Sequence, residues 1–497
     1  MTIRRETLRL ERCACDVCQQ VTIEGECALA GSMRDAVTVL SVQAQACVSK
    51  MQALTDRVAV KGRVSFQVLY TQGDLTRIRA IETTCDFAHE LSAPGAAPGM
   101  RVEAHACVQE TNGAAASGRM TLGVLLEIAA QAYQAQEIEA AAELGGVPGL
   151  CTREQTVTAA VCDSLGEETA LVRQEFDLPQ RLQTDGVLTA TGVVSSSEIT
   201  GGGGRIGVSG VVKVHVLHQA AQQGEALVET THDLPFQVTF DAKNAGEEGL
   251  EASAQVVDVV ADSTMSDKQR TLRVEAEVLV RLCQRSARSV ELLEDLYSTQ
   301  GPILEPKVED VELCLGAPTE EARESLRIAA QLPAGAPAAE TVLAAFAQPI
   351  LSSVSSAGRR TGADGVMNIT IVYLPVDSDI PCAVKMREPF SMTFPLEGNE
   401  HIRGQLQTVE CACGPATSDR VELRCVLALR VKRQEKRLVH LVTDVLQRPE
   451  EKTENGFVLV WPAPGESRWE TARRLRVPQE SLRPAGANAL LAFRRQG

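Results

Sequence analysis

The amino-acid sequence predicts a mainly β protein with three repeated antiparallel β-sandwich-like units and a small βααβ domain at the C-terminus. The first observation behind this prediction is a nine-residue segment that occurs three times. Each copy begins with Gly and ends eight positions later with an aromatic residue or His, at residues 62–70, 210–218 and 365–373. The copies start 148 and 155 residues apart, so a period near 150 residues organises nearly the whole chain.

The second observation is a period-two alternation of apolar and polar residues in and around each copy. Val58, Val60 and Val64 share one face of such a segment. Lys61 and Arg63 lie on the other face. This pattern is typical of half-buried antiparallel strands. A closing segment with the same alternation follows in each copy, at residues 122–128, 272–282 and 423–431.

One segment, residues 126–144, allows two interpretations. It is rich in Ala, Glu and Gln, which favours a helix. The corresponding parts of the other two copies favour a strand, at least as far as Tyr133.

The period and the turn-rich stretches between strands divide the chain into four parts. The predicted repeats are residues 1–147, 148–301 and 302–448, and residues 449–497 form a linker and the small C-terminal domain. A unit of about 150 residues can bury an adequate core on its own. Aromatic residues make up only 3% of the chain, so we expect cores built from Val, Leu, Ile and Ala.

Charge and hydropathy exclude several classes of protein. The net charge of −16 argues against general nucleic-acid binding, which needs a basic surface. No segment approaches the roughly 20 unbroken apolar residues that span a bilayer. The first six residues, Met-Thr-Ile-Arg-Arg-Glu, lack the apolar core of a signal peptide. We therefore expect a protein that stays in the cytosol.

The chain has 15 cysteines without regular pairing, and in a cytosolic protein most of these are small buried residues. Cys13, Cys162 and Cys314 occupy equivalent positions, 49, 48 and 51 residues before the glycines of the repeated segment. The cysteine clusters at residues 13–18 and 411–413 suggest a metal, but neither offers a complete zinc ligand set. We therefore prefer buried or exposed thiols and predict no metal site.

The repeat also argues against reading single residues as catalytic, because a position shared by all three copies reflects the fold. Tyr70, His218 and Tyr373 are one structural position seen three times, so we expect a core or edge role for His218. The sequence contains no Gly-x-Ser-x-Gly, phosphate loop or His-Glu-x-x-His motif. We therefore predict a protein that is not an enzyme and uses no cofactor. A wall hydrolase would need catalytic side chains in one repeat that the others lack, and no such set stands out.

The last 49 residues differ from the rest and contain both tryptophans, Trp461 and Trp469. From Gly465 to the end there are seven Arg and three Glu, a net +4, so the remainder carries −20 within the total of −16. The expected elements are a strand at 457–461, a helix at 469–475 capped by Ser467, a second short helix from Pro478, and a strand at 489–493.

This order of elements resembles a LysM domain. The resemblance rests on Gly465-Glu-Ser-x-Trp-x-x-Ala472 and on Val477-Pro-Gln-Glu-Ser-Leu482. LysM domains carry Gly-Asp-Thr-x-Trp-x-x-Ala and Val-Ser-x-Glu-x-Leu, so Glu466, Ser467 and Pro478 depart from the pattern. The family binds N-acetylglucosamine glycans in a groove between two loops. With one loop altered and the other short, protein binding is at least as strong a hypothesis, and a βααβ cap unrelated to LysM is a further alternative.

The repeated units resemble the SPOCS domain of spore-coat-associated proteins. The resemblance rests on Val58-Ala-Val-Lys-Gly62 with Val68-Leu-Tyr70, on the Pro-Phe-x-x-x-Phe turns that start at Pro235 and Pro389, and on the ending Glu294-Asp-Leu-Tyr297. Three such units followed by a LysM-like tail are similar to the SipL-type morphogenetic proteins of spore-forming clostridia and their relatives. The resemblance covers residues from about 4 to the end.

This resemblance implies a non-enzymatic scaffold of spore coat and cortex morphogenesis, in the mother-cell cytoplasm at the forespore surface. Its implied partners are a coat-assembly ATPase, docked through the LysM-like domain, and other coat proteins. The alternative function is binding of N-acetylglucosamine glycan in the cell wall, with peptidoglycan as the ligand. The candidate contact residues for either ligand are Gly465, Glu466, Ser467, Trp469, Arg473, Arg474 and Arg476.

The arginines among these residues have two interpretations. Arg473, Arg474 and Arg476 would steer the C-terminal domain toward an acidic partner. Alternatively, they form the solvated face of a short helix.

Overall fold

The computed structural model describes residues 1–497 except residues 30–36, 74–76, 180–181, 183, 203, 223–224, 244, 247, 267–268, 317, 398–401, 418, 450–455, 487–488 and 495–497. Within the described residues, strands in antiparallel sheets make up nearly all the regular structure, and the one α-helix is α1 (Arg468–Leu475). The predicted mainly β class is confirmed.

The first repeat forms two three-stranded sheets, in the orders β1-β6-β5 and β2-β3-β4. The strands of this repeat are β1 (Thr2–Ala28), β2 (Val37–Leu54), β3 (Arg57–Gln72), β4 (Arg79–Ser92), β5 (Arg101–Ala116) and β6 (Arg119–Gly145). Alternate residues of β3 and β6 point between the sheets, and the core consists mainly of Val, Leu, Ile and Ala, as the composition predicts.

The second repeat has the same design, with the sheets β11-β12-β7 and β10-β9-β8. The strands of this repeat are β7 (Leu150–Leu178), β8 (Thr184–Gly202), β9 (Arg205–Ala220), β10 (Val228–Asp241), β11 (Leu250–Ser266) and β12 (Gln269–Ser298). His218 at the end of β9 is fully buried, like Tyr373 in the third repeat, so this shared position belongs to the core.

In the third repeat two separate strands, β13 and β14, both pair with β19 and replace the single long first strand. The other sheet has the order β15-β16-β17. The strands of this repeat are β13 (Ile303–Gly316), β14 (Glu320–Gln331), β15 (Ala339–Ala357), β16 (Arg360–Pro375), β17 (Cys382–Phe394), β18 (Ile402–Ala416) and β19 (Arg420–Arg448).

The glycine that opens each repeated segment is required because a phenylalanine ring covers it. Gly62 on β3 lies opposite Phe87 on β4. A Cβ on Gly62 would lie 2.5 Å from that ring and 2.2 Å from the carbonyl oxygen of Cys47, closer than atoms can pack. The same pairing joins Gly210 to Phe236 and Gly365 to Phe390. The sequence repeat therefore records a packing contact.

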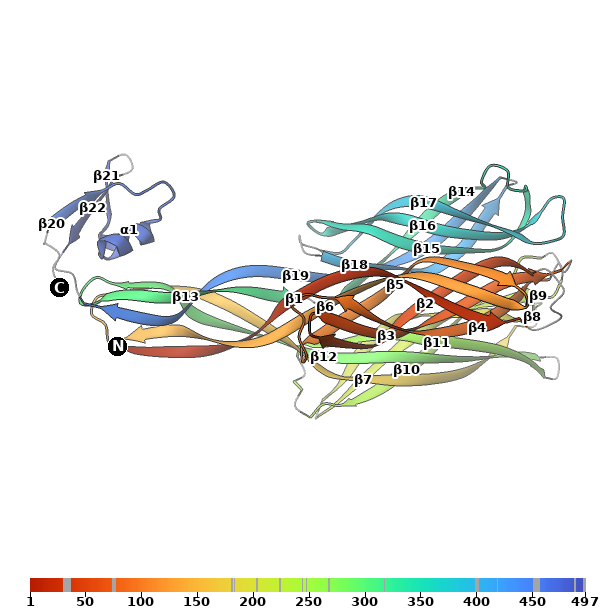
Figure 1. The fold of residues 1–497 in the computed structure, drawn as a ribbon, viewed down its shortest axis with the longest axis horizontal. Helices are drawn as coiled ribbons and strands as arrows, with labels where there is room; N and C mark the ends of the chain where they lie inside the picture. Colours follow the sequence, from red (N-terminus) through yellow and green to blue (C-terminus); the bar gives the residue numbers. More distant parts are fainter. Residues whose placement is uncertain are drawn as a thin grey trace.

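The long strands β6, β12 and β19 run out of the sandwiches and pair with β1, β7 and β13 to form three two-stranded ribbons, which pack together as a stalk (Figure 1). Residues 126–144 are therefore strand throughout, and the helical interpretation is wrong. Ala140 and Ala141 are fully buried where the ribbons meet, so small side chains permit this close packing. The apolar residues that fill the stalk include Leu8, Leu10, Val157, Leu292, Val311 and Leu441.

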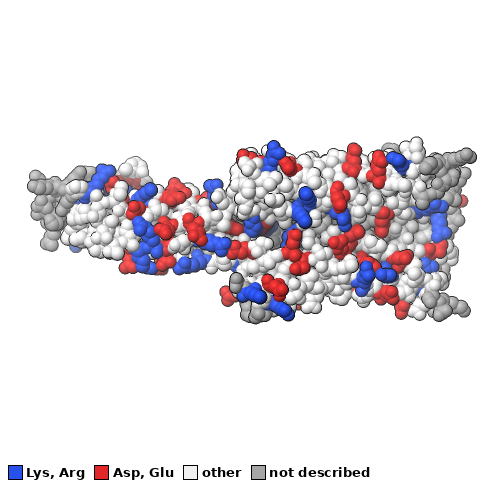
Figure 2. All heavy atoms as spheres, turned by 60° about the horizontal axis from the view of Figure 1, so that its bottom comes forward, with Lys and Arg blue, Asp and Glu red and all other residues white. Residues whose placement is uncertain are grey.

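At the other end of the molecule the three sandwiches lie side by side and form a head (Figure 1). A shared apolar cluster joins them and includes Leu40, Leu69, Leu217 and Leu343. Residues of all three repeats also line a cavity of about 1740 Å³ in the head. On the face drawn in Figure 2, acidic and basic side chains are interspersed over both head and stalk, so the net negative charge is dispersed.

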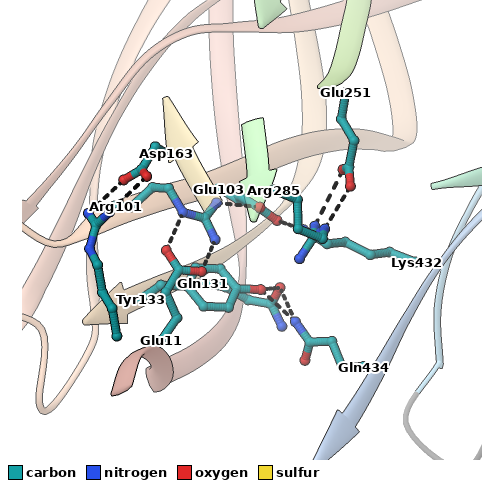
Figure 3. A network of polar contacts seen from close by, with 11 residues as sticks. Glu11, Arg101, Glu103, Gln131, Tyr133, Asp163, Glu251, Arg285, Lys432 and Gln434 are labelled. Atoms are coloured by element: carbon teal, nitrogen blue, oxygen red, sulfur yellow. Dashed lines mark hydrogen bonds and ion pairs between the residues drawn. The ribbon is translucent and has the colours of Figure 1, made fainter. Parts of the chain in front are cut away.

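A polar network holds the repeats together where the stalk meets the head (Figure 3). Arg101 donates hydrogen bonds of 3.0 and 2.9 Å to the two carboxylate oxygens of Glu11. Glu103 pairs with both Arg101 and Lys432 of the third repeat. Burial opposes ionisation of Glu103, but Lys432 and Arg101 hold its pKa at about 2. The ion pair of Glu103 with Lys432 ties the first repeat to the third.

Candidate functional site at the C-terminal module

Residues 456–494 form a separate module with a three-stranded sheet in the order β20-β22-β21. Its elements are β20 (Gly456–Val460), α1, the 3-10 helix η1 (Gln479–Ser481), β21 (Arg483–Gly486) and β22 (Ala489–Arg494). The first predicted helix and both predicted strands are present. The linker predicted before β20 lies mostly outside the described residues.

The second predicted helix is wrong, because the chain after Pro478 makes only one 3-10 turn. Two hydrogen bonds close this turn, from Ser481 to Pro478 and from Leu482 to Gln479. The next residues are Arg483 and Pro484, and a proline disfavours helical backbone in the residue before it. The chain therefore becomes extended as β21, and a βααβ fold is not supported.

Three of the candidate residues shape the loop that leads into α1. Gly465 has φ 84°, a left-handed conformation that suits glycine. Ser467 caps the helix: its hydroxyl accepts from the Glu470 amide at 3.2 Å, and the Glu470 carboxylate accepts from the Ser467 amide at 2.7 Å. Glu466 accepts from the Ala463 amide at 2.7 Å and from Arg474 at 2.9 Å, and these contacts lower its pKa.

Trp469 does not line an open groove, because it packs against the tip of the second ribbon. Only 8% of this residue is exposed. Its indole Nε1 donates a 2.7 Å hydrogen bond to Oδ2 of Asp295 on β12. Its ring meets the ring of Tyr297 edge to face, with 5.0 Å between the centroids. The Tyr297 hydroxyl in turn donates to the carbonyl of Val477 at 2.8 Å.

Two of the arginines also bind the ribbon tip. Arg473 contacts the Asp295 carboxylate at 2.7 Å, and Asp295 is only 6% exposed. Arg476 ends α1 with φ 55°, and its guanidinium donates to the carbonyls of Ser298 at 3.1 Å and Gly301 at 2.8 Å. Asp295 thus accepts hydrogen bonds from both an indole N–H and a guanidinium, a charge-assisted arrangement on a buried carboxylate.

The seven candidate residues therefore lie together, but their contacts are internal. Trp469, Arg473 and Arg476 fasten the module to β12, whereas Gly465, Glu466, Ser467 and Arg474 shape its helix and loop. The other half of this contact, Asp295 and Tyr297, is not among the residues predicted from the sequence to form the site. The sequence does contain a difference that points to them. The second repeat has Tyr297 two residues after Asp295, whereas the third repeat has Leu446 two residues after the equivalent Asp444.

A further feature, not predicted from the sequence, is an exposed apolar strip formed by Phe457 and Leu459 on β20 and by Trp461 directly after it. These alternate residues are 75%, 48% and 62% exposed. In the described part of the chain, β20 pairs only with β22, so it is an edge strand of the module. The available signal was the run of five consecutive apolar residues at 457–461, since a small module buries only alternate side chains of such a strand. Aromatic and apolar side chains displayed this way are typical of protein contacts.

Among the described residues, no three or more His, Cys, Asp or Glu side chains are grouped in a way that could hold a metal ion. In the same part of the chain, no helix has the length and apolar character needed to cross a bilayer.

Comparison with known proteins bears on the first repeat. Residues 35–113, which run from β2 into β5, match the family model described as SipL, SPOCS domain. This match confirms the predicted resemblance to SipL-type SPOCS proteins over part of the first repeat and relates the chain to sporulation. It does not extend to the C-terminal module. No match was found among curated proteins or among solved structures.

Proposed function

We propose that this chain is a non-enzymatic scaffold of spore coat and cortex morphogenesis, and that its C-terminal module docks a coat-assembly ATPase. The SPOCS match supports the role in sporulation. The observation that carries the docking role is the apolar strip of Phe457, Leu459 and Trp461. The strip is exposed on a module that is itself fastened to the end of a packed stalk.

The arrangement of the chain suits a spacer between two assemblies. The head lies at one end of the molecule and the C-terminal module lies at the other (Figure 1). The stalk between them has a continuous apolar core contributed by all three repeats. In this proposal the head contacts other coat proteins, and the module meets the ATPase at the forespore surface, in the mother-cell cytoplasm.

The nature of the partner contact differs from the charge steering that the sequence suggests. Arg473 and Arg476 bind the stalk, and Arg474 binds Glu466 within the module. The strip instead offers aromatic and aliphatic area, the kind of side chain that dominates binding energy in protein interfaces. The candidate residues around α1 then act indirectly, by holding the module in position.

The test is a triple variant of the full chain, Phe457→Ser with Leu459→Ser and Trp461→Ser. Affinity for the purified ATPase should fall roughly tenfold or more, since interface aromatics commonly contribute at least 2 kcal/mol. A fluorescent fusion should also leave the forespore surface in sporulating cells. Leu438→Ser is the matched control, because Leu438 is 61% exposed on the stalk. Unchanged affinity and localisation of the triple variant, with Trp469 still buried by fluorescence, would refute the proposal.

A second candidate function is binding of peptidoglycan glycan, favoured by the exposed indole of Trp461, which can stack on a sugar ring. Chito-oligosaccharides should then shift the emission of Trp461 and leave the buried Trp469 unaffected. Trp461→Phe should abolish the shift, and the absence of a shift at millimolar sugar would exclude this candidate.

A further inference from the structure

Two cysteines of the third repeat face each other across neighbouring strands. Cys411 on β18 and Cys425 on β19 are direct partners in the antiparallel register. Their sulfur atoms lie 3.5 Å apart. Directly opposite residues in antiparallel sheets have Cα atoms about 4.5–5.5 Å apart, and disulfides form at Cα separations of about 4.4–6.8 Å. The backbone is therefore already at disulfide distance, and only the side chains need to move.

The pair has one accessible member and one protected member. Cys425 is completely buried, whereas Cys411 is half-buried. Cys411 also lines the cavity of about 1740 Å³ in the head, as does Cys413 two residues further along β18. A small reagent that enters this cavity meets Cys411 and cannot reach Cys425 directly. The geometry provides one thiol for attack and a second thiol behind it.

The division of roles rests on exposure and geometry, because the electrostatics favour the thiolate of Cys425 over that of Cys411. The hydrogen bond between the two sulfur atoms lowers the pKa of Cys425. The same contact raises the pKa of Cys411, and burial raises it further. Attack by Cys411 is therefore slow at neutral pH, but once Cys411 is modified the sulfur of Cys425 lies within reach of the modified sulfur.

We propose that Cys411 and Cys425 are a disulfide-forming site that reacts with a low-molecular-weight disulfide such as oxidised glutathione. In the first step the Cys411 thiolate attacks one sulfur of the reagent, forms a mixed disulfide and releases one thiol. In the second step the Cys425 thiolate attacks the Cys411 sulfur and releases the other thiol. Two protein thiols are oxidised, one reagent disulfide is reduced to two thiols, and the two protons lost by the cysteines end on the two released thiols.

A disulfide between Cys411 and Cys425 would join the edge strand β18 covalently to β19. Its effect depends on how the third repeat is held by the other two. Three residues after each repeat glycine, Ser65 contacts Asp258 of the second repeat at 3.2 Å, and Asn368 donates to the Gln109 carbonyl of the first repeat at 2.9 Å. The equivalent Lys213 instead binds Asp233 of its own repeat. The second and third repeats are joined at other positions: the Leu227 amide donates to the Leu343 carbonyl at 3.0 Å, and Arg323 donates to the Ser195 carbonyl at 2.8 Å. A disulfide would fasten the edge strand β18 from within its own sheet.

The experiment is oxidation of the purified full chain with oxidised glutathione, followed by alkylation, digestion and mass spectrometry. The expected product is a peptide pair joined through Cys411 and Cys425. Amide exchange in residues 402–416 should slow by roughly tenfold, because strand opening then requires more of the sheet to open. Reduction should restore the original exchange rate.

Two variants and one competing pair make the result decisive. Cys411→Ala should eliminate the joined peptides and the slowed exchange, and Cys425→Ala serves the same purpose if that core position tolerates it. Cys162, whose pKa a hydrogen bond from Cys283 lowers to about 7, is the internal competitor. Joined peptides through Cys413 instead of Cys411, glutathione retained on Cys411, or oxidation confined to Cys162 and Cys283 would each overturn the proposal.

Discussion

The tips of the second and third ribbons share one backbone design but hold different partners. In each tip an aspartate follows a β-bulge and accepts a hydrogen bond from the next amide, at 2.8 Å for Asp295 and 2.9 Å for Asp444. Asp295 then binds Trp469 and Arg473 of the C-terminal module. Asp444 instead binds Arg5 of the first repeat at 3.1 Å.

The two tips differ in the residue that lies two positions after the aspartate. Tyr297 in the second ribbon is 3% exposed beneath the module, whereas Leu446 in the third ribbon is 58% exposed. The repeated backbone supplies a position for an acid, and a single aromatic neighbour makes one tip a docking site. Two copies of a repeat can therefore share the same backbone packing while only one of them binds the C-terminal module.

The largest expected effect is that of Asp295→Ala, which leaves Arg473 and the Trp469 indole without their shared acceptor. The Asp295 carboxylate is buried and the Arg473 side chain is half-exposed, so the loss is that of two hydrogen bonds to a charged group, about 1.5–3 kcal/mol each, and the module should detach from the stalk. Trp469 emission should shift to longer wavelength, and limited proteolysis should release residues 456–497.

The matched control is Asp444→Ala in the third tip, where the salt bridge is exposed on both sides and contributes about 1 kcal/mol or less. This control should retain the wild-type tryptophan emission. If both variants release the module equally, the two tips do not differ in the way the structure indicates.

The next effect in size is that of Tyr297→Leu, which gives the second tip the residue of the third. The variant loses the edge-to-face contact with Trp469 and the hydrogen bond to Val477, together about 1–3 kcal/mol. Amide exchange in α1 should accelerate while the stalk remains protected. The reverse exchange, Leu446→Tyr, should leave α1 unaffected, and a comparable acceleration there would contradict a specific role for Tyr297.

A smaller effect is expected for Arg476→Lys. The lysine keeps the positive charge but cannot donate to both Ser298 and Gly301 in the planar geometry of a guanidinium. We expect a loss of about 1 kcal/mol in docking, measured as a modest increase in amide exchange of residues 468–475. Arg474→Lys is the control, since Arg474 binds only within the module.

The parts of this structure that the sequence predicts are those encoded locally. Alternation identifies the strands, and the Gly-to-Tyr segment marks a Gly–Phe packing contact repeated three times. The docking of the module joins residues about 174 positions apart, and no local pattern relates Trp469 to Asp295. Residues 126–144 have a helical composition, but β1 supplies the strand hydrogen bonds along their length and the neighbouring ribbons supply the burial. The second helix of the module fails because Pro484 directs the chain into β21.

The smallest expected effect is a pH dependence of the stability of α1. It distinguishes contacts within the module from the contacts that dock the module on the stalk. Arg474 and the Ala463 amide lower the pKa of Glu466 below its ordinary value of 4.5. A lowered pKa in the folded state means that the stabilisation is complete above about 4.5 and decreases as the pH falls further. Glu466→Gln should flatten the decline in α1 stability below that pH, as measured by amide exchange. The flattening should be equal in the Tyr297→Leu background, because the Glu466 contacts lie wholly within the module. A pH dependence that disappears in Tyr297→Leu would instead locate the titrating group at the ribbon tip.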